Sequence, residues 1–231
     1  HSDAGFSKED AWIGTLGIYT TNFNKGKLNS GVSRYSSRDL TDMVLTGLQQ
    51  DISARHGIQW TRRGMWNRNY SETRLPAVPS MILEILSHQN FADMKLGHEP
   101  EFKFTVARSV YKSILKYTAT MHGTDYTVQP LPVTRFAIEE KGKNGFQLTW
   151  QGVIDPQEPT ARPKGYIVYT RLGHGGWDNG TYVKGNSYQF QAEPGLVYSF
   201  KVTAVNKGGE SFPSEILSAY HAPKSQGTVL I

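Results

Sequence analysis

The feature that most limits how this chain can fold is a strict alternation near its C-terminal end. Four apolar residues are separated by single polar ones: Tyr198, Phe200, Val202 and Ala204. Successive side chains of a strand point to opposite faces, so the run predicts a strand with one buried face and one exposed face. Pro194-Gly195 before it and Gly208-Gly209 after it are typical of turns.

Further short strands precede this one. Phe146–Trp150 and Tyr166–Thr170 are rich in aromatic and β-branched residues and lie between Gly- and Pro-containing loops. Several short strands with such turns predict a β-sandwich. The residues from Pro194 to Ser211 closely resemble fibronectin type III modules, in which Trp150 matches the core tryptophan and Tyr198 the corner tyrosine. We therefore expect an all-β fibronectin type III sandwich over residues 131–225.

The first part of the chain has helical periodicity instead. One apolar face recurs every four residues and is followed by Gly57 as a stop: Leu40, Val44, Leu48 and Ile52. A second helix is predicted near residues 101–118, with this apolar stripe: Phe104, Ala107, Val110, Tyr111, Ile114 and Leu115. Residues 91–100 read as a connection. With strands between the helices, residues 1–124 are predicted to form an α/β domain, joined to the sandwich by a linker over residues 125–130.

A short apolar run in this first part contains one carboxylate. Pro76 and Pro79 open the stretch, Met81 to Leu83 read as a buried strand, and Glu84 follows directly. A charge in such a strand is unfavourable unless it is paired, hydrogen-bonded or used in chemistry. Sites in open α/β sheets form at the carboxyl ends of strands. Glu84 is therefore the first candidate catalytic residue.

The stretch Pro76-Ala77-Val78-Pro79-Ser80-Met81-Ile82-Leu83-Glu84, with Asn90 and Asp93 after it, resembles the zinc-dependent N-acetylmuramoyl-L-alanine amidases. The opening His1-Ser2-Asp3-Ala4 is similar to another motif of that family. The resemblance covers roughly residues 1–120. It implies a partial amidase-like mixed sheet with helices, a catalytic role for Glu84, and a role for His1 as the third zinc ligand.

The same resemblance sets expectations for the metal. The family's first two zinc ligands, a histidine and a glutamate, come earlier in its sequences than the motif matched by His1. A catalytic zinc needs about three protein ligands. We therefore expect Zn²⁺ in the parent family but no tightly bound zinc and no amidase turnover from residues 1–231 alone. A sheet edge left unpaired would favour association with an upstream fragment or self-association.

Residues 58–74 interleave aromatic and basic side chains. Five of them share one parity, so they would point the same way in an extended segment: Trp60, Arg62, Trp66, Arg68 and Tyr70. One interpretation is a binding surface on which the aromatic side chains stack against sugar rings and the arginines attract carboxylates, with Arg74 or Arg68 holding a peptide carboxylate. The other interpretation is structural: the aromatic side chains pack together and the arginines are solvated. The candidate substrate-binding residues are Arg74, Arg68, Trp66 and Tyr70.

Composition narrows the class of partner. The formal net charge of +5 is spread along the chain, which fits mild attraction to anionic polymers such as peptidoglycan and argues against a dedicated nucleic-acid binder. No run of about 18 apolar residues is present, so no membrane span is expected. The resemblance to the amidases, rather than composition, implies a cell-wall hydrolase of the amidase type that is periplasmic, on the bacterial cell surface or secreted.

Two other functions are compatible with the sequence. The first is a glycan-binding or scaffold protein with a degenerate amidase fold. The second is a polysaccharide lyase, since similar bacterial chains are often labelled xanthan lyases. A lyase removes the proton on the carbon next to a uronate carboxylate, typically with a Tyr or His that lies beside Arg and Asn. Four neighbouring residues are of these types and could form such a site: Asn67, Arg68, Asn69 and Tyr70. The Glu84 motif matches amide hydrolysis better.

Overall fold

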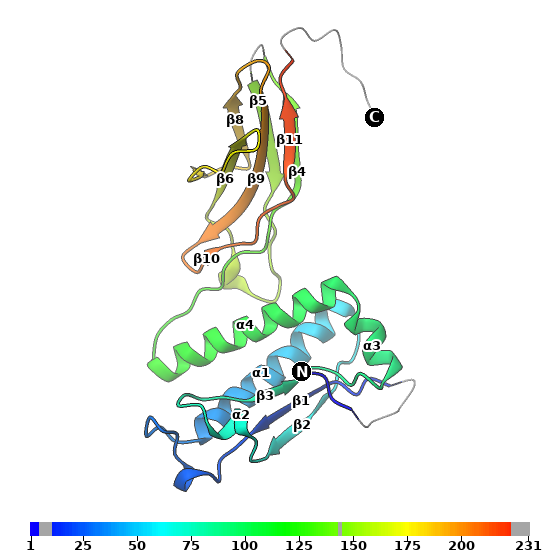
Figure 1. Cartoon of the computed structure of the whole chain (residues 1–231), viewed down its shortest axis with the longest axis vertical. Helices are drawn as coiled ribbons and strands as arrows, with labels where there is room; N and C mark the ends of the chain where they lie inside the picture. The colour runs from blue at the N-terminus through cyan, green and yellow to red at the C-terminus, as the bar shows by residue number, and fades with distance from the viewer. Residues whose placement is uncertain (5–10, 143–144, 223–231) are drawn as a thin grey trace. The chain divides into compact units, whose positions relative to one another are not determined.

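The structure is a computed structural model that describes residues 1–4, 11–142 and 145–222 (Figure 1). The chain divides into two compact units, residues 1–125 and residues 126–231. Each unit has its own sheets and its own buried cluster of apolar side chains.

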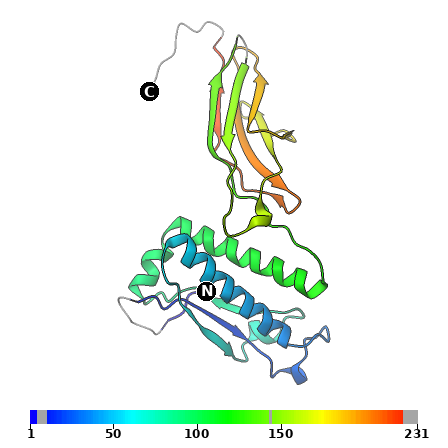
Figure 2. The ribbon, with the colours of Figure 1, turned by 180° about the vertical axis from the view of Figure 1, so that it is seen from behind.

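Unit 1 is built on a three-stranded mixed sheet. Its central strand β1 (Thr15–Tyr19) pairs in parallel with β2 (Arg62–Asn67) and antiparallel with β3 (Ile82–Glu84). An isolated parallel bridge joins Asp3 to Ser87 next to β3. The long helices α1 (Tyr35–His56) and α4 (Pro100–His122) lie on one face of this sheet (Figure 2). The short elements are η1 (Asn24–Gly26), α2 (Ser71–Arg74) and α3 (Phe91–Gly97).

Helix α1 matches the predicted apolar face. Val44, Leu48 and Ile52 are buried and form a cluster with Trp60 and two residues of α4. The helix ends at Gly57, which is left-handed with φ 63° and donates its backbone N–H to the Ser53 carbonyl. A glycine accepts this conformation without steric cost, so the predicted stop is confirmed.

The predicted apolar stripe of α4 is wrong. Phe104 is 37% exposed and Ile114 is 48% exposed, while the buried face is displaced around the helix. That face is formed by Phe102, Thr105, Val106, Ser109, Ser113, Tyr117 and Ala119. Small side chains let α4 approach α1 closely: a Cβ on Gly47 of α1 would lie 2.4 Å from Ser113 Oγ. Close helix contact therefore selects small polar residues, which apolar periodicity does not detect.

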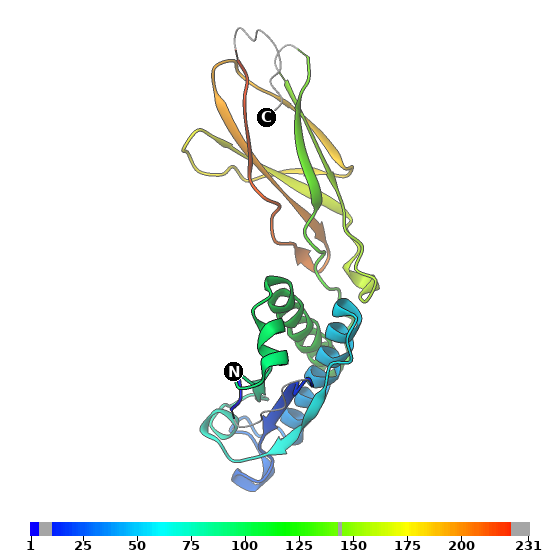
Figure 3. The ribbon, with the colours of Figure 1, turned by 90° about the vertical axis from the view of Figure 1, so that its right-hand side faces the viewer.

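The connection predicted over residues 91–100 contains a helix instead. Helix α3 lies beside the N-terminal part of α4 (Figure 3). The side chain of Asn90 accepts a hydrogen bond from the Asp93 backbone N–H at 2.8 Å, which caps the first turn. Asparagine is among the strongest N-cap residues, because its side chain satisfies a backbone donor that the helix leaves free.

The shared orientation predicted for the aromatic and basic side chains of residues 58–74 is also wrong. Trp60 is fully buried and Arg62 pairs with Asp42 of α1, so both lie on the helix side of the sheet. A bulge follows, because Thr15 pairs with Arg62 whereas Leu16 pairs with Gly64. One extra residue reverses the parity. Trp66 pairs with Ile18 and lies on the opposite face.

Unit 2 is an antiparallel sandwich of two sheets. The first has the order β4 (Thr134–Glu140), β5 (Gly145–Gln151) and β8 (Ser187–Gln191). The second has the order β10 (Gly209–Glu210), β9 (Val197–Asn206), β6 (Gly165–Leu172) and β7 (Thr181–Val183), with β11 (Leu217–Tyr220) also paired to β9. The short helix η2 (Pro159–Ala161) precedes β6.

The core between these sheets is formed by alternate residues of β5, β6 and β9. Trp150, Phe200 and Val202 are buried, as the sequence predicts, and Tyr166 and Val168 of β6 are buried with them. Trp150 and Tyr166 pack edge to face with ring centroids 5.5 Å apart. The predicted combination of helices with a mixed sheet, followed by a β-sandwich, is confirmed.

Candidate functional site

Glu84 is the last residue of β3 and points away from the long helices. Its neighbour Leu83 packs against the α1–α4 cluster. Leu83 pairs with Gly17 of β1, where a Cβ would lie 2.3 Å from Thr41 Cγ2 of α1. Since side chains alternate along a strand, Glu84 lies on the opposite face, with Leu16 as its partner in β1.

His1 reaches Glu84 because the first residues of the chain run parallel to the residues around the end of β3. The Ile85 backbone N–H donates to the His1 carbonyl at 3.1 Å, and the Asp3 N–H donates to the Leu86 carbonyl at 2.8 Å. This pairing places His1 Nδ1 3.6 Å from Glu84 Oε1. At that separation the two groups are close enough for an ion pair but not for a direct hydrogen bond.

The environment of Glu84 favours its neutral form. Its side chain is 14% exposed, whereas that of His1 is 65% exposed. Burial raises the pKa of Glu84, and the Asp3 carboxylate adds to that direction, while the His1 amino group and Arg63 oppose it. Glu84 Oε2 is buried and has no hydrogen-bond partner among the described residues. A carboxyl group with a raised pKa and a free oxygen is suited to proton transfer.

Two further residues belong to this face of the sheet. Arg63 pairs with Asp3 at 2.5 Å between Nη2 and Oδ2. The Arg63 guanidinium lies 5.9 Å from the centre of the Trp66 ring, and Trp66 is 40% exposed. The sequence interpretation did not single out Asp3 or Arg63. Arg63 could have been found only from the bulge in β2, which sequence parity does not reveal.

The other candidate residues lie near the opposite end of β1. Glu84 pairs with Leu16, whereas the Arg68 backbone N–H donates to the Tyr19 carbonyl at 2.8 Å. Three residues along a strand correspond to about 10 Å. Tyr70 and Arg74 follow Arg68 at that end. The Arg74 guanidinium lies 6.0 Å from the Phe23 ring centre. The backbone pairing thus brings His1 and Glu84 together and does not gather Arg68, Tyr70 and Arg74 beside them.

Asn90 and Asp93, which belong to the stretch that resembles the amidases, hold the backbone together. The Asp93 carboxylate is fully buried and accepts hydrogen bonds from the backbone N–H groups of Ile13, Gly14 and Ser87. Asn90 Nδ2 donates to the Ala11 carbonyl at 3.2 Å. These bonds tie the segment before β1 to the segment after β3, and so fix the register that positions Glu84.

The described residues do not complete a zinc site. No group of three His, Cys, Asp or Glu side chains converges within residues 1–4, 11–142 and 145–222. His1 and Glu84 supply two candidate donor groups, fewer than the three protein ligands typical of a catalytic zinc. None of the helices among these residues is long and apolar enough to cross a membrane.

Comparison with known proteins identifies the second unit. Residues 131–220 match the family model "Fibronectin type III domain", and they form a fibronectin type III domain. A comparison with curated proteins gave no match.

Among solved structures, the chain is similar to the twitchin kinase region from C. elegans, with 20% identity and a TM-score of 0.38 over 43% of this chain and 18% of that one. The chain is also similar to the chicken CNTN1 FN1-FN3 domains, with 15% identity and a TM-score of 0.37 over 43% of this chain and 34% of that one. For the kinase and flanking domains of titin, the identity is 22% and the TM-score is 0.36, over 41% of this chain and 18% of that one. The chain thus spans about a fifth of the length of the twitchin structure.

Proposed function

We propose that residues 1–125 are part of a hydrolytic domain of the N-acetylmuramoyl-L-alanine amidase type and that Glu84 is its proton-transfer group. The observation that carries this proposal is the combination at Glu84 of burial, a raised pKa and an unpartnered Oε2, with His1 3.6 Å away. The substrate class is peptidoglycan or a related anionic bacterial glycan. The protein acts in the periplasm, at the cell surface or as a secreted protein.

Glu84 has two steps to perform in this chemistry. In the first, Oε2 accepts a proton from the water that attacks the amide carbonyl between the lactyl group and L-alanine. In the second, the same oxygen donates that proton to the leaving amine nitrogen, so the carboxylate is regenerated. A general base or acid of this kind contributes about two to four decades in rate. The raised pKa brings the group closer to neutral pH, where both steps are efficient.

Under this proposal the metal site is not completed by the described residues alone. Among the described residues, His1 is the one ligand that the resemblance to amidases matches, and Glu84 serves proton transfer rather than metal binding, so the described residues leave the metal site short of the three ligands that a catalytic zinc needs. Zinc lowers the pKa of the attacking water when it is bound in such sites. The fibronectin type III domain serves as a spacer or attachment module, by analogy with the use of such domains.

The test uses the gene product that contains residues 1–231, with a muramyl peptide as substrate. Release of an N-terminal alanine supports the amidase. Glu84→Gln should lower turnover by about two to four decades and leave the zinc content unchanged. Glu99→Gln is the matched control, because Glu99 is exposed and its side chain does not cap α4. Normal turnover of Glu84→Gln would remove Glu84 from the mechanism.

A glycan-binding scaffold is the second candidate, and the Trp66–Arg63 pair favours it. An exposed indole beside a guanidinium can stack a sugar ring and attract a carboxylate. In that case the protein sediments with insoluble peptidoglycan without releasing products, and Trp66→Ala weakens the binding. Release of alanine together with unchanged sedimentation of Trp66→Ala would exclude the scaffold.

The lyase alternative is less well supported by the arrangement of its residues. Asn67 Oδ1 accepts the Thr21 backbone N–H at 3.0 Å, and Asn67 Nδ2 donates to Thr21 Oγ1 at 2.5 Å. Asn67 is therefore used to hold the chain after β1. A lyase would produce an unsaturated sugar that absorbs ultraviolet light, whereas an amidase frees an amine, so product analysis separates the two.

A further inference from the structure

A groove lies on the helix side of β3, on the face opposite Glu84. It has a volume of about 830 Å³ and is bounded by the residues around β3, by α3 and by the N-terminal half of α4. We call it the α3–α4 groove. Its volume falls within the usual range for small-molecule sites, about 300–1,000 Å³.

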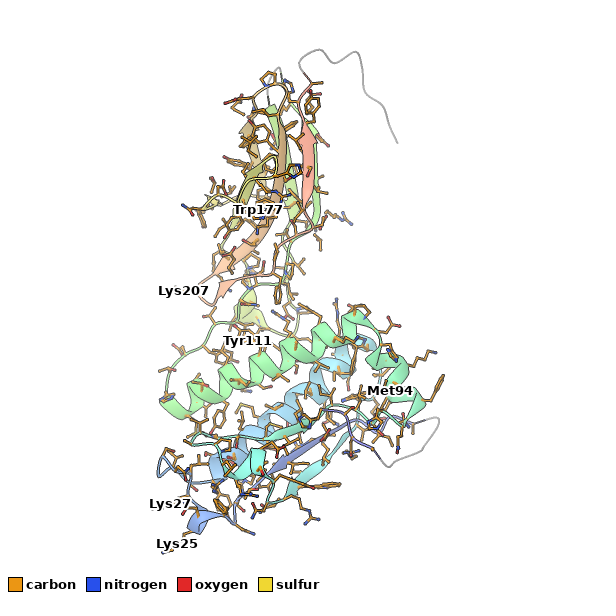
Figure 4. The ribbon with its side chains drawn as sticks, in the orientation of Figure 1. Lys25, Lys27, Met94, Tyr111, Trp177 and Lys207 are labelled. Atoms are coloured by element: carbon orange, nitrogen blue, oxygen red, sulfur yellow. The ribbon has the colours of Figure 1, made fainter. Side chains whose placement is uncertain are left out.

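The floor of the α3–α4 groove is apolar. Eight apolar side chains line it: Leu83, Ile85, Leu86, Met94, Phe102, Val106, Ala107 and Val110. Phe102 and Val106 are buried in the α1–α4 cluster, which makes the floor part of the packed core. Met94 contributes from α3 (Figure 4). Methionine is flexible and polarisable, which suits a surface that receives an apolar guest.

The polar residues around this floor include one cation and no anion. They are His1, Ser2, His88, His98 and Lys103, and no lining residue is Asp or Glu. His88 Nδ1 lies 3.2 Å from Ser2 Oγ, so this ring is held at the rim. Lys103 is exposed on α4 one turn before Ala107. A lining with one lysine cation, with histidines that can each donate one N–H, and without carboxylates favours an anionic group.

We propose that the α3–α4 groove binds a free amphiphile that has one apolar body and one carboxylate or sulfonate head. The apolar body lies along the floor between β3 and α4. The head lies at the rim, where Lys103 and His98 can donate to its oxygens. Glu84 faces the other side of the sheet and does not line the groove, whereas His1 borders both the groove and Glu84.

The test is isothermal titration of residues 1–231 with decanoate, a monomeric anionic probe, and with decanol, its uncharged counterpart. We expect saturable one-to-one binding of decanoate and weaker binding of decanol. Lys103→Glu should weaken decanoate binding by about tenfold or more, because it replaces the attractive charge with a repulsive one. Ala107→Trp should abolish binding by filling the groove from an exposed helix position.

Lys116→Glu is the matched control, since Lys116 is exposed on α4 and does not line the groove. Its affinity for decanoate should equal that of the wild type. If Ala107→Trp lowers stability, Lys103→Glu still decides the question. The proposal is overturned if decanoate does not bind, if decanol binds as well as decanoate, or if Lys103→Glu and Lys116→Glu have the same effect. Binding to phosphatidylglycerol vesicles with none to free decanoate would also overturn it.

Discussion

Asp93 accepts a hydrogen bond from the backbone N–H of Ile13 at 2.9 Å, across 80 residues of sequence. The same buried carboxylate accepts from Gly14 and Ser87, so it joins the start of β1 to the end of β3. The sheet register, and with it the position of Glu84, depends on these bonds. A single side chain therefore links the stability of unit 1 to the geometry of the candidate site.

Asp93→Ala should destabilise unit 1 by about 3–5 kcal/mol, because three buried N–H groups lose a charged acceptor. Urea unfolding followed at 222 nm measures this, since the described α-helices all belong to residues 1–125. Asp125→Ala, at an exposed aspartate, should change stability by less than about 0.5 kcal/mol. A cost below about 1 kcal/mol for Asp93→Ala would contradict the proposed role of Asp93.

Lys112 of α4 and Asp51 of α1 form a second link between distant segments. Their charged atoms are 2.8 Å apart and both side chains are nearly buried. Lys112→Met should cost about 3–5 kcal/mol, because it leaves the Asp51 carboxylate buried without its partner. The double variant Lys112→Met/Asp51→Leu should recover most of that loss, as a double-mutant cycle would show. Additive losses would mean that the pair does not interact.

Much of the fold could be predicted from the sequence where one periodicity dominates. The alternation from Tyr198 to Ala204 predicts β9, and Gly57 marks the end of α1 because only glycine tolerates its left-handed conformation easily. The buried face of α4 could not be found in this way. Its contact with α1 uses Ser109 and Ser113, whose small size matters more than their hydropathy.

The candidate site could be predicted only in part. The resemblance to amidases suggested Glu84 and His1, and parallel backbone pairing brings them within 3.6 Å. The shared orientation of Trp60 and Trp66 failed because one bulge in β2 reverses the side-chain alternation. A bulge depends on pairing with β1, so it leaves no mark in the sequence of β2 alone. The sequence does not predict the apolar α3–α4 groove, because residues 91–100 carry no helical pattern and are predicted to be a connection.

Glu84 should make stability depend on pH in a defined direction. Burial raises its pKa in the folded state, so protonated Glu84 contributes stability below the ordinary pKa of the unfolded chain. That contribution is lost as the pH rises through the folded-state pKa. At pH 7 the wild type therefore bears the cost of a buried charge, and Glu84→Gln removes it.

We expect Glu84→Gln to be more stable than the wild type at pH 7 and similar to it at about pH 3.5, below the ordinary pKa of glutamate. Urea titrations at both pH values, followed at 222 nm, measure the difference. Glu99→Gln serves again as the control and should show no such dependence. A Glu84→Gln variant that is less stable than the wild type at pH 7 would show that the carboxylate is stabilised by its surroundings.

Residues 126–231 should fold without the rest of the chain. Within the described residues, both sheets of the sandwich pair with strands of this unit alone, and its core is formed by residues of the same unit. The fragment is of ordinary size for a domain. We expect a single cooperative thermal transition, monitored by circular dichroism.

Within the fragment, Tyr198→Phe should lower the melting temperature by roughly 4–8 °C, because the Glu193 backbone N–H loses its bond to the Tyr198 hydroxyl. An unfolded spectrum for the fragment would contradict its independence, and an unchanged melting temperature would show that this bond contributes nothing.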